Sequence, residues 1–170
     1  MNQLENKVNT FNFPLWATIE LGVGPKTTDE LKLALKGTGA YTCIGMNYFL
    51  NQIEISQEGT LCNLFTASNK ELGFKGKTKL KDTHARILEI GGVLLPAEVA
   101  PQIVIQCGDK VDVDVGLTLA MESIVNQVYD PSLFVMKRYD HDPLLYLMIS
   151  HGYPGTLWDA NTRFVFGRQE

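Results

Sequence analysis

The 170-residue chain contains only three cysteines and three histidines. Cys43, Cys62 and Cys107 lie far apart and form no C-x-x-C pair, which argues against a disulfide framework and against a zinc-ribbon site. A reducing cytoplasm therefore suits the chain, and each cysteine is interpreted first as a small buried apolar residue. We expect neither a bound metal ion nor a cofactor.

The sequence also lacks the patterns of secretion and of membrane insertion. Its first residues contain no basic region followed by an apolar run, so no signal peptide is predicted. The longest uncharged run, 37–53, is rich in Gly, Thr, Asn and Gln, which excludes a membrane span and a membrane partner. A net charge of −4 excludes a general attraction to nucleic acid, so that any such attraction would be local.

What is present is the composition of an ordinary globular protein, with 45% hydrophobic and 20% charged residues. The length predicts one domain over 1–170, with 1–12 as a candidate disordered segment. Helical patterns fall in the first half, where a capping box at Thr27 and Glu30 begins a helix that ends at Gly37. A further helix is predicted within 43–53, where Ile44, Tyr48 and, on an adjacent stripe, Phe49 have helical spacing, and another within 79–92, where His84, Ile87, Leu88 and Gly91 follow in order.

Strand patterns dominate the second half of the chain. Strands are predicted at 15–21, 60–68, 102–107, 115–124, 132–139, 143–150 and 162–168. This segregation predicts an α+β fold in which helices of the N-terminal half pack on a largely antiparallel sheet, built mostly from the C-terminal half.

The stretch "NKELGFKGKTKLKD" at 69–82 contains five lysines and a GKT triplet. A phosphate-binding P-loop needs a glycine six residues before its lysine, and Glu71 stands six residues before Lys77. We therefore interpret the stretch as a turn before a helix, with solvated lysines. An anion site or a nucleic-acid contact through 70–81 stays open as the alternative. Its candidate residues are Lys75, Lys77 and Lys79.

Acid–base and nucleophilic residues show no diagnostic spacing. Asp140, His141 and Asp142 are consecutive, so their side chains would point alternately along a strand and are predicted to form a hairpin loop. Cys43 precedes a predicted helix, where a thiolate would be stabilised. The weak catalytic candidates, which would have to meet in space, are His141, His151, Asp159 and Cys43.

The segment 150–164, "SHGYPGTLWDANTRF", is long for a connection and combines aromatic and charged residues. Loops presented by a rigid sheet often carry binding residues, so we predict a ligand or partner site here. In the structural alternative, Trp158 covers the core and Asp159 pairs with Arg163 or caps a turn. The predicted binding residues are Tyr153, Trp158, Asp159 and Arg163.

The stretches "TTDELKLALK", "ELGF", "LLPAEVAPQIVIQ", "LAME" and "LWDANTRFVFGR" resemble those of a group of small bacterial proteins without an assigned activity. The resemblance covers most of the chain and implies a bacterial cytoplasmic protein with helices preceding the sheet. It brings no activity, cofactor or catalytic residue.

Three functional hypotheses follow from these observations. The leading one is a non-enzymatic binding or regulatory module that engages a protein or a small molecule over the sheet face and the segment 150–164. The first alternative is a metal-assisted or acid–base hydrolase acting on an anionic or nucleotide-like substrate. The second alternative is nucleic-acid binding through the lysine-rich segment 70–81.

Overall fold

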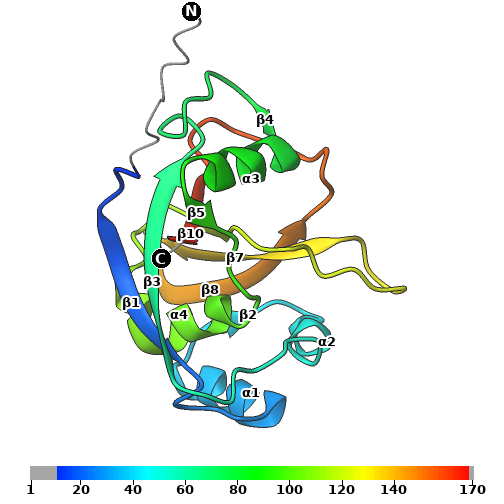
Figure 1. Ribbon diagram of the computed structural model, residues 1–170. Helices are drawn as coiled ribbons and strands as arrows, with labels where there is room; N and C mark the ends of the chain where they lie inside the picture. The colour runs from blue at the N-terminus through cyan, green and yellow to red at the C-terminus, as the bar shows by residue number, and fades with distance from the viewer. Residues whose placement is uncertain (1–10, 169–170) are drawn as a thin grey trace, which may run out of the picture.

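The computed structural model describes residues 11–168, which form an α+β fold around a large mixed sheet (Figure 1). The eight-stranded sheet has the order β1–β3–β10–β6–β7–β8–β2, with β5 paired to β10, and β4 and β9 form a separate two-stranded sheet. The helices are α1 (Thr28–Gly37), α2 (Met46–Leu50), α3 (Leu80–Glu89) and α4 (Val99–Cys107), followed by the 3-10 helix η1 (Gly108–Lys110). The strands are β1 (Leu15–Leu21), β2 (Tyr41–Thr42), β3 (Thr60–Ser68), β4 (Thr78–Lys79), β5 (Gly92–Val93), β6 (Leu117–Leu119), β7 (Ser132–Tyr139), β8 (Asp142–His151), β9 (Leu157–Trp158) and β10 (Arg163–Arg168).

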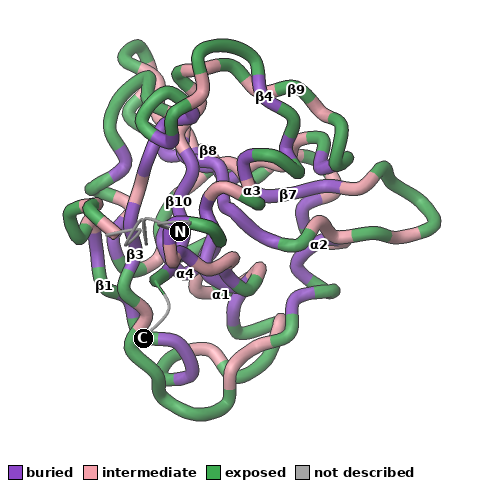
Figure 2. Tube along the Cα trace, turned by 45° about the horizontal axis from the view of Figure 1, so that its top comes forward, coloured by how far each residue is buried: buried purple, intermediate pink, exposed green. Residues whose placement is uncertain are grey.

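The two faces of the main sheet carry different helices. Residues paired directly across neighbouring strands point to the same face, so the register assigns each side chain. One face packs on α4, and its residues include Ile19, Leu64, Val165, Leu117, Met136 and Leu147. The opposite face carries Phe65, Phe164 and Phe166, and α3 lies over it (Figure 1). Figure 2 shows buried chain where these layers meet and exposed chain in the surrounding loops.

Helix α1 begins as its sequence predicts. Thr27 has an extended backbone, and its Oγ1 accepts a hydrogen bond from the Glu30 N–H at 3.2 Å. The Glu30 carboxylate reaches back one residue further than expected and accepts from the Lys26 N–H at 2.6 Å. The cap therefore satisfies one free backbone donor of the first helical turn, that of Glu30, and the backbone donor of Lys26 just before the N-cap.

The segment 102–107, predicted as a strand, lies instead in helix α4. The run 99–107 is apolar and buried on nearly every side, with even Gln102 only 2% exposed. A helix buried all round shows no amphipathic period, so its pattern cannot be told from that of a buried strand. Pro101 lies in the first turn, where its missing N–H removes no helical hydrogen bond.

Three other predictions need correction. The helix predicted within 43–53 is reduced to the five residues of α2, and Ile44, assigned to its apolar face, is 97% exposed. The strand predicted at 115–124 is reduced to the three residues of β6. The sheet is mixed, because β6 runs parallel to β10 and β2 runs parallel to β8. The first half of the chain contributes the long strands β1 and β3 to it.

The outer edge of β1 is closed by a side chain. The Gln106 carboxamide accepts from the Glu20 N–H at 2.8 Å and donates to the Glu20 carbonyl at 2.7 Å, as a neighbouring strand would. A bonded edge cannot pair with a strand of another molecule at this position.

Most of the segment predicted to be disordered, 1–12, lies outside the described residues. Phe11, which is described, packs edge-on against Phe65 with a centroid distance of 4.8 Å. Within residues 11–168, none of the helices has the length and apolar character required to cross a lipid bilayer.

Candidate functional site

The lysine-rich segment and the segment 150–164, which are far apart in the sequence, lie side by side. Strand β4 pairs antiparallel with β9, which places Thr78 opposite Trp158 and Lys79 opposite Leu157. The N–H groups that begin α3 donate to carbonyls of the same segment, from Leu80 to Thr156 at 2.9 Å and from Lys81 to Pro154 at 3.0 Å. The two segments therefore form one surface.

The lysine-rich segment is a turn closed on its own backbone. The Phe74 N–H donates to the Asn69 carbonyl and the Gly73 N–H to the Lys70 carbonyl, both at 3.0 Å. Gly73 has a φ of +100°, which favours glycine. Because these N–H groups are already bonded within the chain, they are not directed at a phosphate. The side chains of Lys75, Lys77 and Lys79 remain exposed.

Glu71, the residue that argued against a P-loop, stabilises this turn. Its carboxylate accepts from the Ser68 N–H at 2.7 Å and pairs with the Arg163 guanidinium at 2.8 Å. The hydrogen bond from the Ser68 backbone and the Arg163 charge lower the pKa of Glu71, against the opposing effect of partial burial. Arg163 thus pairs with Glu71, whereas the sequence offered Asp159 as its partner.

The other predicted binding residues divide between the core and the surface. Trp158 is half-buried against Phe164, with ring centroids 5.7 Å apart, and its Nε1–H is buried without a hydrogen-bond partner among the described residues. The Asp159 side chain is exposed, with an oxygen 3.9 Å from Lys77 Nζ. Tyr153 is 44% exposed and donates its hydroxyl to Asp130 at 2.6 Å.

The candidate catalytic residues do not converge on one pocket. His141 lies at the β7–β8 hairpin beside Asp140, at 3.4 Å, whereas His151 lies at the far end of β8 and is 3.9 Å from Asp130. Nine residues of strand between them correspond to roughly 30 Å. Cys43 is half-buried, and its N–H donates to the backbone of β8. Among residues 11–168, no group of three or more His, Cys, Asp or Glu residues is arranged to hold a metal ion.

Glu98 is buried, and its carboxylate is hydrogen-bonded within the chain. The side chain is 1% exposed, and its carboxylate accepts from the Ser56 N–H at 3.1 Å and from the Ser56 hydroxyl. These donors compensate the carboxylate for the loss of water, and Glu98 needs no ligand to explain its burial.

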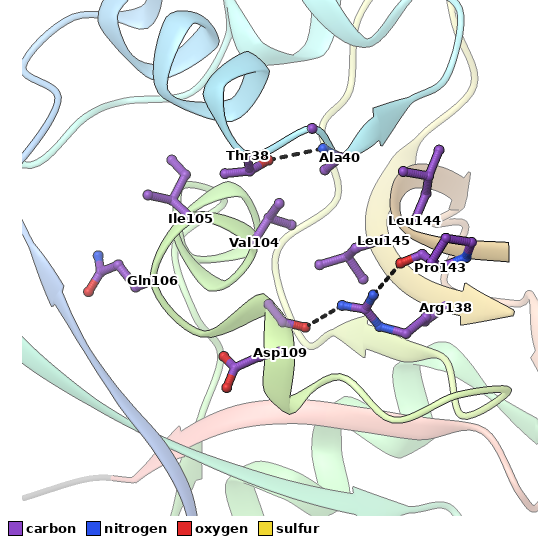
Figure 3. Close-up of a pocket in the computed structure, with 12 residues that line it drawn as sticks. Thr38, Ala40, Val104, Ile105, Gln106, Asp109, Arg138, Pro143, Leu144 and Leu145 are labelled. Atoms are coloured by element: carbon purple, nitrogen blue, oxygen red, sulfur yellow. Dashed lines mark hydrogen bonds between the residues drawn. The ribbon is translucent and has the colours of Figure 1, made fainter. Parts of the chain in front are cut away.

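One hollow lies between α4, the end of α1 and the start of β8, and its volume is about 360 Å³ (Figure 3). Arg138 is the cation in its wall. The Arg138 guanidinium donates to the carbonyls of Gly108 at 3.0 Å, Pro143 at 2.5 Å and Val111 at 3.4 Å. These bonds use the directional donors of Arg138 to hold α4 against the β7–β8 hairpin, so we assign Arg138 a structural role.

A second hollow, which we call the α3 groove, has the character of a binding site. It has a volume of about 470 Å³ and lies between α3 and the segments 121–125 and 152–154. Exposed apolar side chains extend along its rim, since Leu88 is 53% and Val125 71% exposed. A mainly apolar cavity of this size with a few polar groups is typical of ligand sites. Its apolar lining residues are Leu80, Ala85, Leu88, Leu94, Met121, Val125, Pro131 and Pro154.

The walls of the α3 groove are held by hydrogen bonds. The Gly152 N–H donates to the Pro131 carbonyl at 2.7 Å, and the Ser123 hydroxyl donates to the Gly152 carbonyl at 2.6 Å. Gly152 is required here, because a Cβ atom at this position would lie 2.3 Å from Ser123 Oγ. The groove is therefore preformed.

His84 is the polar side chain closest to the core in the α3 groove. Its ring stands edge-on to Phe164, and its Nε2 is buried without a partner among the described residues. Burial lowers the pKa of His84, and the carboxylate of Glu122 opposes this shift only in part. Near neutral pH the imidazole is uncharged, which is compatible with an apolar occupant.

Sequence reasoning assigned His84 and Leu88 to the apolar face of a helix and did not identify the groove. The signal available in the sequence was that Ile87 and Leu88 are adjacent, so both cannot lie at the centre of one narrow apolar stripe. In the structure Ile87 is fully buried and Leu88 is exposed. The facing residues Met121 and Glu122 were predicted to lie in a strand over 115–124, which the structure ends at Leu119, and Val125 follows that segment.

No family model matches the chain, and the comparisons found no similar curated protein and no similar solved structure. The geometry of the described residues therefore carries the functional argument.

Proposed function

We propose that this protein is a non-catalytic binding module and that its α3 groove receives a short apolar segment of a partner protein. The observation that carries this proposal is the preformed apolar hollow of about 470 Å³ whose rim continues into the exposed side chains of Leu88 and Val125. Apolar surface that extends beyond the cavity suits an extended chain better than a compact metabolite.

The occupant is recognised by side chains in this proposal. The Lys81 N–H donates to the Pro154 carbonyl, and the Gly152 N–H donates to the Pro131 carbonyl, so these backbone donors at the groove are already used. Addition of the partner as a further β-strand at this wall would break existing bonds. Insertion of apolar side chains between α3 and Val125 breaks none.

The segment 150–164 supports the same proposal through its position. Gly152 and Pro154 form one wall of the groove, and Tyr153 lies between them in the chain. Of the predicted partner residues, Tyr153 is the one we place at the contact. Trp158 packs on Phe164 and Arg163 pairs with Glu71, so we assign both to the structure of the segment. We place the module in the cytoplasm, because Cys43, Cys62 and Cys107 are all unpaired thiols.

A fluorescence titration with the apolar probe 1-anilinonaphthalene-8-sulfonate tests the groove. Leu88→Glu introduces a charge at the rim, and we expect the affinity to fall roughly tenfold, since one buried leucine contributes about 1.5–3 kcal/mol. Leu61→Glu is the matched control, because Leu61 is a comparably exposed leucine on β3 and is not a groove residue. Equal effects of the two substitutions would refute the groove as the binding site.

A selection from displayed peptides then tests the class of partner. The wild-type protein and the Leu61→Glu control should enrich the same apolar sequences, and Leu88→Glu should fail to enrich them. Enrichment of sequences without apolar residues, or enrichment that survives Leu88→Glu, would overturn the proposed mode of recognition.

A further inference from the structure

Three tyrosines gather at the β7–β8–β2 end of the main sheet, on the face opposite α4. Tyr146 lies 5.0 Å from Tyr41 and 5.2 Å from Tyr139 between ring centroids. The first pair is tilted by 46° and the second is nearly perpendicular, at 85°. Tyr41 is 47% exposed and the other two are half-exposed, so the rings form an open, angular cluster.

Carboxylates lie near this tyrosine cluster. The Tyr146 hydroxyl donates to Asp142, and Asp140 follows Tyr139 in the chain. A second acidic segment is attached to the same strand, because the Asp114 N–H donates to the Arg138 carbonyl at 2.7 Å and Val113 bridges to Arg138. The exposed acidic residues at this end of the sheet are Asp112, Asp114 and Asp140.

The two cations nearby leave the acidic character intact. Arg138 points to the opposite face, where three backbone carbonyls hold its guanidinium. Lys137 lies on the tyrosine face, with its ammonium 4.8 Å from the centroid of the Tyr139 ring. This contact shows that a ring of the cluster accepts a cation over its face.

We propose that Tyr41, Tyr146 and Asp142 form a cation-binding site for a lysine or arginine side chain in a basic segment of a partner protein. The Tyr41 and Tyr146 rings, tilted by 46° and in contact, present one open aromatic surface over which a cation can lie, and the adjacent Asp142 carboxylate adds charge complementarity. The excess of exposed acids and the net charge of −4 favour a basic partner at long range as well. This site is on a different part of the surface from the α3 groove and does not depend on the function proposed for that groove.

The same geometry disfavours the other common occupants of exposed aromatic side chains. Nucleobases stack on aromatic planes in register, whereas the Tyr139 and Tyr146 planes are almost perpendicular. The phosphates of a nucleic acid would also meet Asp140 and Asp142. A basic polypeptide satisfies both the rings and the carboxylates.

Fluorescence anisotropy with a labelled peptide of alternating lysine and glycine tests this site. The comparison peptide has the same sequence with every lysine acetylated, which removes the charge and keeps the length. We expect the lysine peptide to bind at low salt and the acetylated peptide to bind at least about tenfold more weakly. Tyr41→Leu should weaken binding about threefold, and Tyr41→Phe, which keeps the ring, should stay within about twofold of wild type.

Tyr129→Leu is the matched control, because Tyr129 is 41% exposed and its ring contacts Tyr48 and Phe49, outside the cluster. Its affinity for the lysine peptide should equal that of the wild type. Equal binding of both peptides, no binding at low salt, or unchanged affinity of Tyr41→Leu would each overturn the proposal. Loss of binding in Asp142→Asn with no loss in Tyr41→Leu would show charge attraction without a ring contribution, and would overturn it too. Tyr41 lies on an exposed edge strand, so Tyr41→Leu tests the rings without disturbing the core.

Discussion

Trp158 allows the sharpest test of how the segment 150–164 is held. Truncation of a fully buried tryptophan to alanine costs about 3–5 kcal/mol. Trp158 is half-buried against Phe164, which reduces the expected loss to about 2 kcal/mol. Its indole N–H is buried without a partner among the described residues, a burden of about 1–3 kcal/mol in the native state that alanine removes. The expected change for Trp158→Ala therefore lies between a loss of about 1 kcal/mol and a gain of about 1 kcal/mol, well short of the cost of truncating a fully buried tryptophan.

Trp158→Phe separates the two contributions. Phenylalanine keeps a ring against Phe164 and has no N–H to leave unpaired, so we expect a stability within about 1 kcal/mol of wild type, on either side. Both variants are compared with wild type by urea denaturation, followed by far-UV circular dichroism because the changes remove one of two tryptophans. If Trp158→Phe were less stable than wild type by clearly more than about 1 kcal/mol, the indole N–H would have a partner in the native state and the reasoning would be refuted.

Three further predictions address the groove wall, the histidine and the sheet edge. Gly152→Ala places a Cβ 2.3 Å from Ser123 Oγ and should lower the free energy of unfolding by about 1–3 kcal/mol, measured by urea denaturation. An unchanged midpoint would show that Ser123 moves to accommodate the Cβ. Because burial lowers the pKa of His84, the unfolded chain binds its proton at higher pH than the folded one, and stability should fall as the pH drops below about 6.5, by at most about 1.4 kcal/mol per pH unit. His84→Gln should flatten this slope in thermal melts between about pH 7 and pH 5, and an identical slope would contradict the shift. Gln106→Ala removes both bonds to Glu20 and should cost about 2 kcal/mol while increasing light scattering from association at the β1 edge; a monodisperse variant of wild-type stability would contradict the capping role.

The elements with local signals were predictable. The cap at Thr27, the alternation in β1 and the β-rich runs between turn residues that became β3, β7, β8 and β10 are visible in the sequence, and each of these elements was placed within one or two residues of its observed bounds. Helix α4 was not predictable, because burial on all sides removes the periodicity that separates a helix from a strand. Ile44 led to the opposite error, a helix predicted where there is none. Its spacing matched a helical face, but the chain turns at Gly45, whose φ is +85°, and α2 begins only after it.

The candidate sites depend on contacts between distant segments. The pairing of Thr78 with Trp158 involves two strands of two residues each, which are too short to show an alternating pattern. The α3 groove requires Leu88 to face Val125, and the tyrosine cluster requires the parallel pairing of Tyr41 with Tyr146. Sequence periodicity identifies which face of an element is apolar, but it does not identify the element on the other side.

The position of β10 determines when the chain can complete its fold. Arg163–Arg168 lies in the middle of the sheet, between β3 and β6, so the backbone hydrogen bonds that join the two sides of the sheet pass through it. A nascent chain on the ribosome therefore cannot complete this sheet until β10 has left the exit tunnel. Until then the inner edges of both half-sheets are open, and chaperone binding during translation is expected to concentrate on them.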